Sequence, residues 1–509
     1  MERKVLFLLA FFCFASFSFA DKKPKYLTYE QFGAYGDGVH EDQEAIAATH
    51  RAANEMDVPV HVDGTKTYRI GPNSKTIVVQ TDVDFSNAKF IIDDVGTSDR
   101  HTENIFRIES RQKPIPLEGV TSLKKGQKEL GITLPERSLV YVCDKNHAIY
   151  IRYGLNQNNG TAQQEVFVAD KKGRIEPNGP IVWNYNHISS IIAYPVDKKK
   201  LTIRGGHFLT IANQAESHYN YRNRGIIISR SNVLVENLEH KVEGELDHGA
   251  PYAGFIDVHW ATDVVIKDCM LCPHFTYTTI GSAGKPVQMG SYDLQAAHSV
   301  GVLFRNIRQS RDIDDTRYWG LFASNFCKDL RLEGCCISRF DAHMGVANVT
   351  LRKCTFGHMG VRMVGFGTIH LEDCEVHHRD LVSLREDYGS SWEGDLVVKN
   401  CTLMPRNPNI DETHILSGNN NGKHDFGYLC HLPNRITIKG LRIVDGQLGE
   451  KYKGPRIFST FGRNMQDSNL LPYDVKGQVI VKGLKAESGK PLQMSSNTKL
   501  FKNMELQMK

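Results

Sequence analysis

The residues best suited to chemistry in this sequence are concentrated between Ser338 and Glu393. Carboxylate, imidazole and guanidinium side chains are crowded there into two very short repeats: Arg339, Asp341, His343, His358, Arg362, His377, His378, Arg379, Arg385, Glu386 and Asp387. Carboxylates and histidines are common proton donors and acceptors in enzymes, and arginine binds carboxylates and other anions. The mixture predicts a site that holds, and cuts, a polar sugar-like molecule.

The start of the 509-residue chain is typical of an exported protein. A basic residue at Arg3 precedes an apolar run from Val5 to Phe17, and small residues end at Ala20. We therefore expect residues 1–20 to be a signal peptide, with cleavage near Ala20 and a secreted or periplasmic mature protein. No later run approaches the roughly 18 apolar residues of a membrane span, so no membrane insertion is expected. A net charge of +4 with interspersed acids and bases argues against nucleic-acid binding.

A six-residue phrase recurs along the chain and determines the expected fold. It reads apolar, any residue, apolar, polar, then Asn, Asp or Gly, then Cys, Leu or Ile. The phrase occurs at 233–238, 264–269, 302–307, 330–335, 349–354, 369–374, 396–401, 436–441 and 479–484. Two successive steps of 19 and 20 residues leave no room for a helix between parallel strands. One turn of a parallel β-solenoid does fit.

The last two positions of the phrase have separate physical reasons. Asn, Asp and Gly tolerate a positive φ, so the chain can bend at the fifth position, where Lys353 is the exception. The sixth side chain then points into the coil. Cysteine and the apolar residues Leu and Ile alternate at this position: Cys269, Cys335, Cys354, Cys374 and Cys401 are the cysteines. We expect a ladder of buried free thiols in preference to disulfides or a zinc site.

The N-terminal region carries a motif of its own. Residues 32–38 read Phe-Gly-Ala-Tyr-Gly-Asp-Gly, and a helical pattern follows from Glu41 to Ala53. This stretch resembles the start of pectate-lyase-like right-handed parallel β-helix proteins, which open with Phe-Gly-Ala-x-Gly-Asp-Gly, two acids and a short helix. Gln43 stands where that family usually has threonine. The resemblance implies the fold and a cap on the first coil, and it implies no substrate.

The predicted fold class is therefore all-β: a right-handed parallel β-helix with a short N-terminal capping helix and an inserted antiparallel β element. We expect the cap and first coils in 21–110, the inserted element in 111–200, and the main β-helix with its groove in 201–509. The insert is predicted from the turn sequences at 156–160 and 170–173, which separate β-rich runs as in hairpins.

A second signature predicts a polar strip along one face of the solenoid. It occurs at Asp257-Val258-His259, Asp293-Leu294-Gln295 and Asp341-Ala342-His343, shortly before three of the phrases. In a strand the middle residue faces the core while its neighbours face outward. Extending the register adds Arg362 and Arg385 to the strip. Because parallel coils stack about 4.8 Å apart, Asp341, His343, His358 and Arg362 are predicted to form one site.

The surroundings of this strip suggest an acidic glycan. Arg311, Arg339, His358 and His378 fall in equivalent positions after the phrase, and a positive groove suits a uronate-containing chain. The alternative is that they offset nearby acids. The residues predicted to bind substrate are Asp257, His259, Gln295, Arg339, Arg385, Glu386 and Asp387, with Trp319 and Trp392 as platforms for sugar rings.

Our leading interpretation is a glycoside hydrolase that acts on a polysaccharide or oligosaccharide. Hydrolysis needs one protonated carboxyl group and a second carboxylate. Asp341 is the main candidate for acid or base. Its partner is Asp293, about 10 Å away across two coils, or Asp257 or a loop acid such as Asp315. The asparagine, aspartate and arginine motifs of polygalacturonases are missing, so the resemblance covers the fold and leaves the enzyme family open.

Two alternatives remain. A polysaccharide lyase would use Arg362, Arg339 or Arg385 to neutralise a uronate and His343 or His358 to take its proton. A non-catalytic glycan-binding protein would use the groove for adhesion alone. No metal ligands and no cofactor are expected, apart from a bound Ca²⁺ if the protein is a lyase.

Overall fold

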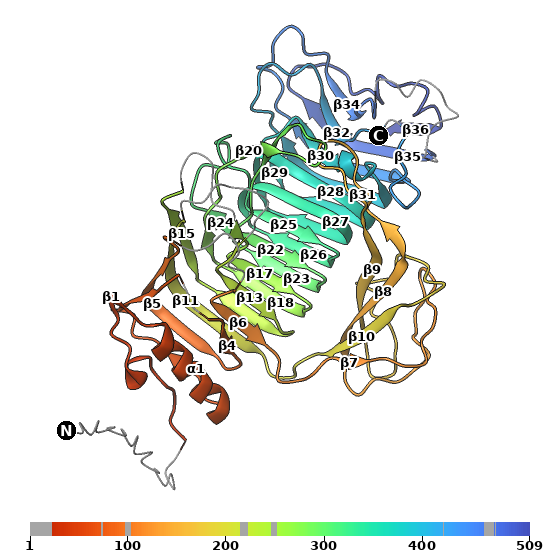
Figure 1. Cartoon of the computed structure of the whole chain (residues 1–509). Helices are drawn as coiled ribbons and strands as arrows, with labels where there is room; N and C mark the ends of the chain where they lie inside the picture. The colour runs from red at the N-terminus through yellow and green to blue at the C-terminus, as the bar shows by residue number, and fades with distance from the viewer. Residues whose placement is uncertain are drawn as a thin grey trace, which may run out of the picture.

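Most of the chain coils into a right-handed parallel β-helix, which confirms the predicted fold class (Figure 1). The computed structural model describes residues 23–72, 75–96, 103–213, 222–245, 252–420, 422–462, 473 and 475–509. The expected signal peptide lies outside the described residues. Within them, no helix has the length and apolar content needed to cross a membrane.

Each coil contributes to three parallel ladders of strands. The first, which we call the groove ladder, contains β4 (Ile77–Val79), β6 (Phe106–Glu109), β13 (Ile226–Ser229), β17 (Ile256–His259), β22 (Leu294–Ala297), β25 (Phe322–Asn325), the middles of β27 (Cys336–Arg352) and β28 (Thr355–Glu372), β30 (Asp380–Leu384), β32 (Thr413–Ser417) and β34 (Pro455–Phe458). This ladder carries the predicted polar strip.

The second ladder, the phrase ladder, is built from the six-residue repeats. It contains β2 (Val60–His61), the starts of β5 (Val83–Asp93) and β11 (Leu201–Ile211), β14 (Val233–Glu236), β18 (Thr262–Lys267), β23 (Val300–Arg305), β26 (Lys328–Glu333), the ends of β27 and β28, the starts of β31 (Trp392–Leu403), β33 (Arg435–Ile443) and β35 (Gly477–Ala486), and β36 (Met504–Met508).

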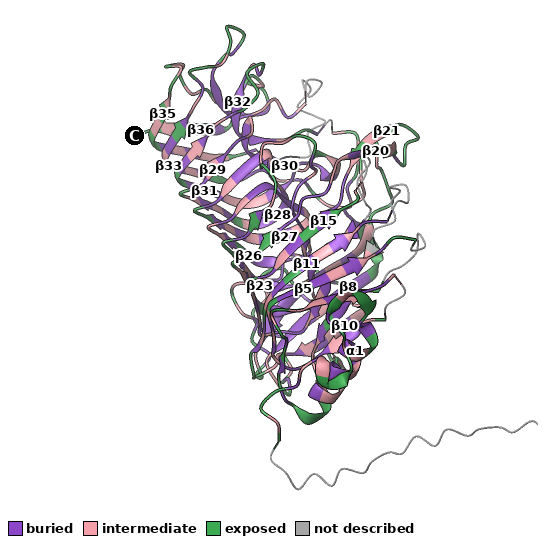
Figure 2. Cartoon of the chain, turned by 90° about the vertical axis from the view of Figure 1, so that its left-hand side faces the viewer, coloured by how far each residue is buried: buried purple, intermediate pink, exposed green. Residues whose placement is uncertain are grey.

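The third ladder follows the phrase. It contains β1 (Asp37–Glu41), β3 (Thr67–Ile70), the ends of β5 and β11, β15 (Glu239–Glu243), β19 (Met270–Leu271), β24 (Arg308–Gln309), the starts of β27 and β28, β29 (Glu375–Val376), and the ends of β31, β33 and β35. Along many strands buried residues alternate with less buried ones, so one side chain in two enters the interior (Figure 2).

The fifth position of all nine phrases has a positive φ, as the sequence predicts. The values lie between 51° and 72° at Asn237, Asp268, Asn306, Gly334, Lys353, Asp373, Asn400, Gly440 and Gly483. Even Lys353, with φ 53°, bends in the same way. The geometry of the coil therefore imposes this conformation on a residue that does not favour it.

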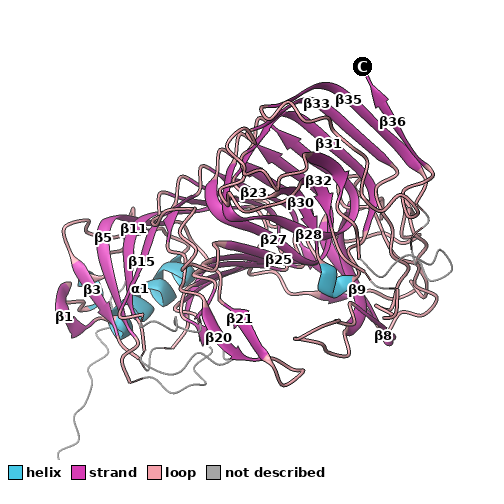
Figure 3. Cartoon of the chain, turned by 90° about the horizontal axis from the view of Figure 1, so that it is seen from above, coloured by secondary structure: helices cyan, strands magenta, loops and turns pink. Residues whose placement is uncertain are grey.

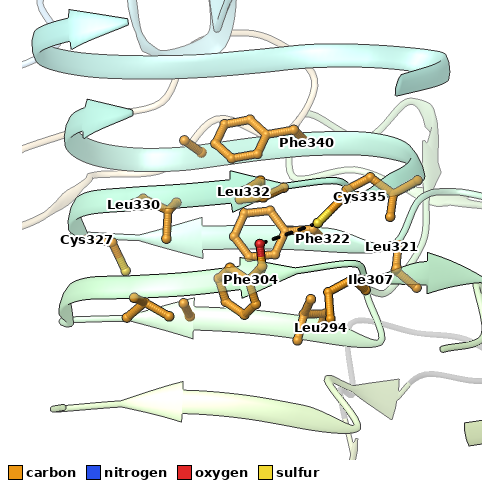
Figure 4. Packing of buried hydrophobic residues seen from close by; sticks show 14 of the residues in the cluster. Leu294, Phe304, Ile307, Leu321, Phe322, Cys327, Leu330, Leu332, Cys335 and Phe340 are labelled. Atoms are coloured by element: carbon orange, nitrogen blue, oxygen red, sulfur yellow. Dashed lines mark hydrogen bonds between the residues drawn. The ribbon is translucent and has the colours of Figure 1, made fainter. Parts of the chain in front are cut away.

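The cysteines belong to the core. All ten cysteines of the expected mature chain are free, and Cys335 lies among Phe304, Ile307 and Phe322 with its thiol 3.5 Å from the Phe304 carbonyl oxygen (Figure 4). The predicted ladder of buried thiols is confirmed.

The N-terminal cap forms as predicted from the motif. A short 3-10 turn (η1, Glu30–Phe32) and helix α1 (Gln43–Met56) close the first coil (Figure 3). Asp42, the second acid of the motif, explains part of the pattern. Its carboxylate accepts hydrogen bonds from the backbone N–H groups of Tyr35 and Arg69, at 2.6 and 3.1 Å, and so ties the glycine-rich loop to the coil.

The inserted element is an antiparallel sheet beside the solenoid (Figure 1). Its strands are β7 (Ile115–Pro116), β8 (Ser138–Ile149), β9 (Thr161–Ala169) and β10 (Ser190–Pro195), in the order β7-β10-β8-β9. Two further small pairs lie in loops: β12 (Arg222–Asn223) with β16 (Tyr252–Ala253), and β20 (Tyr277–Ile280) with β21 (Pro286–Met289). A second 3-10 turn, η2 (Glu386–Tyr388), follows β30.

Buried polar and aromatic contacts anchor the insert to the coils. Lys328 of β26 forms an ion pair with Glu165 of β9, and both side chains are almost fully buried. Nearby, Trp260, His298 and Phe326 occupy one corner of three successive coils, all with positive φ. Their rings stack at 4.2 and 5.0 Å between centroids. Tyr141 of β8 and Tyr194 of β10 pack against Trp260, at 4.8 and 5.5 Å between ring centroids, and so hold the sheet against this corner of the solenoid.

Candidate functional site

The register of the groove ladder decides which polar residues are neighbours. Strand pairing aligns one residue from each successive coil: Asp257, Gln295, Ala323, Asp341, Arg362, Ser383 and Ser417. Arg362 is therefore the direct neighbour of Asp341, as expected. Asp293 is two residues out of this register, because Gln295 pairs with Asp257. The predicted alignment of Asp257, Asp293 and Asp341 is wrong on this point.

Asp293 instead closes a buried corner of its coil. Its carboxylate accepts hydrogen bonds from the backbone N–H of Cys272 at 2.9 Å and from Nδ1 of His240 at 2.7 Å, and it lies 3.3 Å from Nε2 of His274. Burial alone would raise its pKa, but His240 and His274 hold the pKa of Asp293 well below its usual range. Asp293 is 1% exposed, so it does not face a substrate.

Asp341 lies under the groove floor, completely buried. Arg385 donates to both carboxylate oxygens at 2.7 Å, Arg339 donates at 2.5 Å, and the Tyr292 hydroxyl donates at 2.7 Å. Burial would raise its pKa, but the charges of Arg339 and Arg385 hold the pKa of Asp341 well below its usual range. The group stays ionised and fully engaged, an arrangement that positions the two arginines and offers no proton to a substrate.

The charges continue in alternation beyond Asp341. Arg385 also binds Asp387 at 2.9 Å, and Asp387 accepts a second hydrogen bond at 2.6 Å from Arg152, which follows β8. His343 packs edge-on against Tyr388, with 5.4 Å between the ring centroids. Burial and the charge of Arg385 lower the pKa of His343 to about 3, so the ring is neutral. Asp387 and His343 are thus parts of the supporting framework.

Neither predicted tryptophan platform faces a ligand in the groove. The Trp319 ring packs against the Arg339 guanidinium, 4.5 Å from centroid to cation, and thereby helps to bury it. Trp392 is 0% exposed and donates from Nε1 to the Gly367 carbonyl at 2.8 Å inside the solenoid. The structure therefore places both rings in packing roles.

The remaining predicted residues lie away from Arg362. His358 is held over the acidic loop, with its Nδ1 3.0 Å from the Ile313 carbonyl oxygen. Asp257 and His259 pair with each other at 3.2 Å on the coil that precedes Gln295. These residues share the solenoid surface with the site and do not converge on it.

An open cavity of about 430 Å³ lies further along the groove ladder, and Arg362 lines it. Among the described residues, no ion-pair partner is found for the Arg362 guanidinium. The guanidinium groups of Arg339 and Arg385, by contrast, both pair with Asp341. Burial, then the neighbouring charges of Arg339 and Arg385, lowers the pKa of Arg362. Within the described residues Arg362 is thus a cation without a direct ion pair, in an open cavity that the carboxylates of Asp380 and Glu386 also line.

Sequence reasoning did not identify the polar group opposite Arg362. Asp380 of β30 accepts hydrogen bonds from Nδ1 of His414 and from the Ser417 hydroxyl, both at 2.7 Å, and from the Ser383 hydroxyl at 3.2 Å. Burial opposes ionisation, but these hydrogen bonds hold the pKa of Asp380 well below its usual range. β30 and β32 do not carry the six-residue phrase, so no pairing of Asp380 with His414 and Ser417 could be predicted from the sequence.

Glu386 lines the cavity, and His378 lies near Arg362 outside the cavity lining. His378 packs against Gly360, where a Cβ atom would lie only 2.9 Å from the His378 Cβ. Its Nδ1 accepts the Asp380 backbone N–H at 3.2 Å, so the ring hydrogen is assigned to Nε2, and burial lowers its pKa. Glu386 in η2 is exposed, and Asn419 donates to its Oε2 at 3.1 Å.

This arrangement can bind an anion and expose it to a carboxylate base. Arg362 supplies positive charge and Glu386 supplies an accessible carboxylate, while the neutral His378 lies near Arg362. In the described part of the chain, no three or more His, Cys, Asp or Glu side chains are grouped so that they could hold a metal ion.

The chain was compared with known proteins. No protein-family model matches it, and no curated protein sequence matches it. Among solved structures it is similar to the tailspike gp61 of Pseudomonas phage phi297, with a TM-score of 0.47 and 10% identity over 93% of this chain and 77% of that one. The gp54 tailspike of Acinetobacter baumannii bacteriophage AP22, in complex with a capsular saccharide, has a TM-score of 0.48 and 11% identity. The match covers 91% of this chain and 70% of that one. The A-module of the Azotobacter vinelandii mannuronan C-5 epimerase AlgE6 has a TM-score of 0.40 and 10% identity. The match covers 95% of this chain and 99% of that one.

Proposed function

We propose that this protein is an exported polysaccharide lyase that binds a uronate-containing glycan in the Arg362 cavity and cleaves it by β-elimination. The observation that supports this proposal is the half-buried Arg362 guanidinium, which lines an open cavity while its neighbours Arg339 and Arg385 are paired with Asp341. A cation in such a position stabilises an anionic ligand, and arginine binds carboxylates in a bidentate geometry.

The charges beneath the cavity support this role for Arg362. Asp341 is shared by Arg339 and Arg385, so little of its negative charge remains to offset Arg362. His378 lies near Arg362, and its Nε2–H is proposed to donate to the same ligand. A sugar carboxylate bound to both groups would have its negative charge neutralised, and neutralisation makes the adjacent C5–H more acidic.

Glu386 is the proposed base for this reaction. It takes the C5 proton, the electron pair of the C5–H bond forms the C4–C5 double bond, and the C4–O bond breaks. The departing oxygen takes a proton from water or from protonated Glu386. The products are an unsaturated uronate end and a new reducing end, and no oxidant or reductant is required.

Hydrolysis by a carboxylic acid pair fits these groups less well. A general acid must carry a proton near neutral pH, which requires a raised pKa. The pKa values of Asp341, Asp293 and Asp380 are all lowered by their hydrogen bonds and charged neighbours. We therefore favour elimination over the glycoside hydrolase interpretation.

The test is to incubate the protein with acidic and neutral polysaccharides while following reducing ends and the ultraviolet absorbance of new double bonds. We expect both signals from a uronate polymer, and a loss of about 100-fold in rate in Arg362→Gln, the scale of one transition-state charge contact. Arg435→Gln, an exposed arginine on the phrase ladder, is the matched control. Reducing ends without absorbance would indicate hydrolysis, and binding without either product would indicate adhesion.

A further inference from the structure

A second cavity lies between the inserted sheet and the solenoid, around the bend of the coil from Arg362. Its volume is about 270 Å³, near the lower end of small-ligand pockets, which begin at roughly 300 Å³. We propose that this cavity binds one residue of a neutral saccharide, and that the insert serves as a carbohydrate-binding element. The proposal does not depend on the reaction proposed for the Arg362 cavity.

Aromatic rings form the walls of this cavity. Trp183, which lies between β9 and β10 of the insert, packs edge-on against Phe366 of β28, with 4.8 Å between ring centroids. Tyr428 lies 5.7 Å from the same indole ring. Trp183 and Tyr428 are only partly buried, so ring surface remains available inside the cavity. The apolar C–H face of a pyranose packs on such surfaces.

Polar groups at one end of the cavity can exchange hydrogen bonds with sugar hydroxyls. Glu393 of β31 forms an ion pair with Lys125 of the insert and lies 3.8 Å from Nε2 of His431. All three side chains are about a third exposed or more. Because the lysine offsets the carboxylate charge, the cavity favours an uncharged ligand with several hydroxyl groups. This chemistry differs from that of Arg362.

One exposed apolar side chain has no packing explanation and supports the proposal. Leu429 lines the cavity and is 75% exposed, among the largest exposed fractions of the large apolar residues in the described chain. Its neighbours in sequence, Tyr428 and Cys430, are packed into the protein, so the loop that carries it is well anchored. A ligand seated on Trp183 would cover the Leu429 side chain.

The probes are the methyl glycosides of glucose, galactose, mannose and N-acetylglucosamine, tested by saturation-transfer NMR and tryptophan fluorescence. We expect at least one to bind and to change the Trp183 signal. Trp183→Leu should weaken that binding about tenfold, the scale of one strong aromatic contact. Leu429→Ser removes an exposed side chain, so it should preserve the fold and weaken binding several-fold.

Arg362→Gln separates this proposal from the proposed function. It should leave glycoside binding unchanged while it slows cleavage of a uronate polymer about 100-fold. The proposal is overturned if none of the four glycosides binds, if Leu429→Ser binds as tightly as the unaltered protein, or if Arg362→Gln removes the binding. A simple aromatic probe such as phenol that binds when no glycoside does would also overturn it.

Discussion

Asp341 shows how a residue of the right type can lie at the right place and have a different role. Its position in the strip and its pairing with Arg362 follow from the period of the strand and the short coil. Its complete set of hydrogen bonds does not, because only Arg339 is on the same strand, whereas Tyr292 precedes β22 and Arg385 follows β30. The sequence indicated the neighbourhood, and only packing shows that Asp341 holds the arginines.

The main expected effect of Asp341→Asn is therefore a lower free energy of unfolding, because the carboxylate holds two arginines and does not act on substrate itself. Removing one partner from a buried charge network typically costs about 3 to 5 kcal/mol. Because the pKa of Asp341 is lowered in the folded state, its contribution is present above the ordinary carboxylate pKa of about 4 and is lost as the pH falls below it. Urea unfolding measured between neutral and acidic pH should show a flatter pH dependence for the variant.

Asp373→Asn is the matched control for that experiment. Asp373 is an exposed bend residue with φ 53°, and asparagine accepts the same backbone conformation. Its free energy of unfolding should change by less than about 0.5 kcal/mol. An Asp341→Asn variant as stable as this control would contradict the role assigned to the buried carboxylate.

At the scale of the element, a feature of a strand could be predicted from the sequence when the residues that cause it are close together in the chain. The bend at the fifth phrase position and the inward cysteine at the sixth arise within six residues, and all nine bends form as expected. The register of β22 is set by a long excursion that contains the β20–β21 hairpin, so the Asp293 alignment failed. The Asp380 cluster joins β30 and β32, which lie outside the phrase and are separated by residues 385–412, and these hydrogen bonds were not visible in the sequence either.

The bend at Lys353 makes a prediction at this scale. The left-handed conformation is sterically unfavourable for lysine and less so for asparagine. Lys353→Asn should therefore raise the free energy of unfolding by about 0.5 to 1 kcal/mol. Lys439→Asn, at an exposed extended position of a phrase strand, should lower it because asparagine is disfavoured in strands. Equal effects of both substitutions on chemical denaturation would argue against strain at the bend.

At the scale of the whole molecule, the insert is attached through buried polar chemistry. Glu165 accepts the backbone N–H groups of Val182 and Trp183 at 3.0 and 3.1 Å while it pairs with Lys328. One carboxylate thus links β26, β9 and the wall of the second cavity. Neither residue stood out in the sequence, because 163 positions separate them along the chain.

Lys328→Met should loosen this attachment. It leaves the Glu165 carboxylate buried without its cation, at a cost of about 3 to 5 kcal/mol. Adding Glu165→Gln should restore part of that loss, because the remaining charge is removed. Native-state hydrogen exchange of β8 and β9 reports the effect on the insert. Arg174→Gln breaks an exposed pair with Asp170 and should change little, and a similar result for Lys328→Met would contradict the anchoring role.

The two shortest coils, with steps of 19 and 20 residues, carry the same bend and the same inward cysteine. Each is a complete turn without a long loop, so its strands can form the same parallel hydrogen bonds with the turn before it and the turn after it. Duplication of one such turn would lengthen the groove by about 4.8 Å, whereas loss of one would remove Asp341 or Arg362. The span of polymer that the surface can accommodate is therefore a property that evolution can adjust one turn at a time.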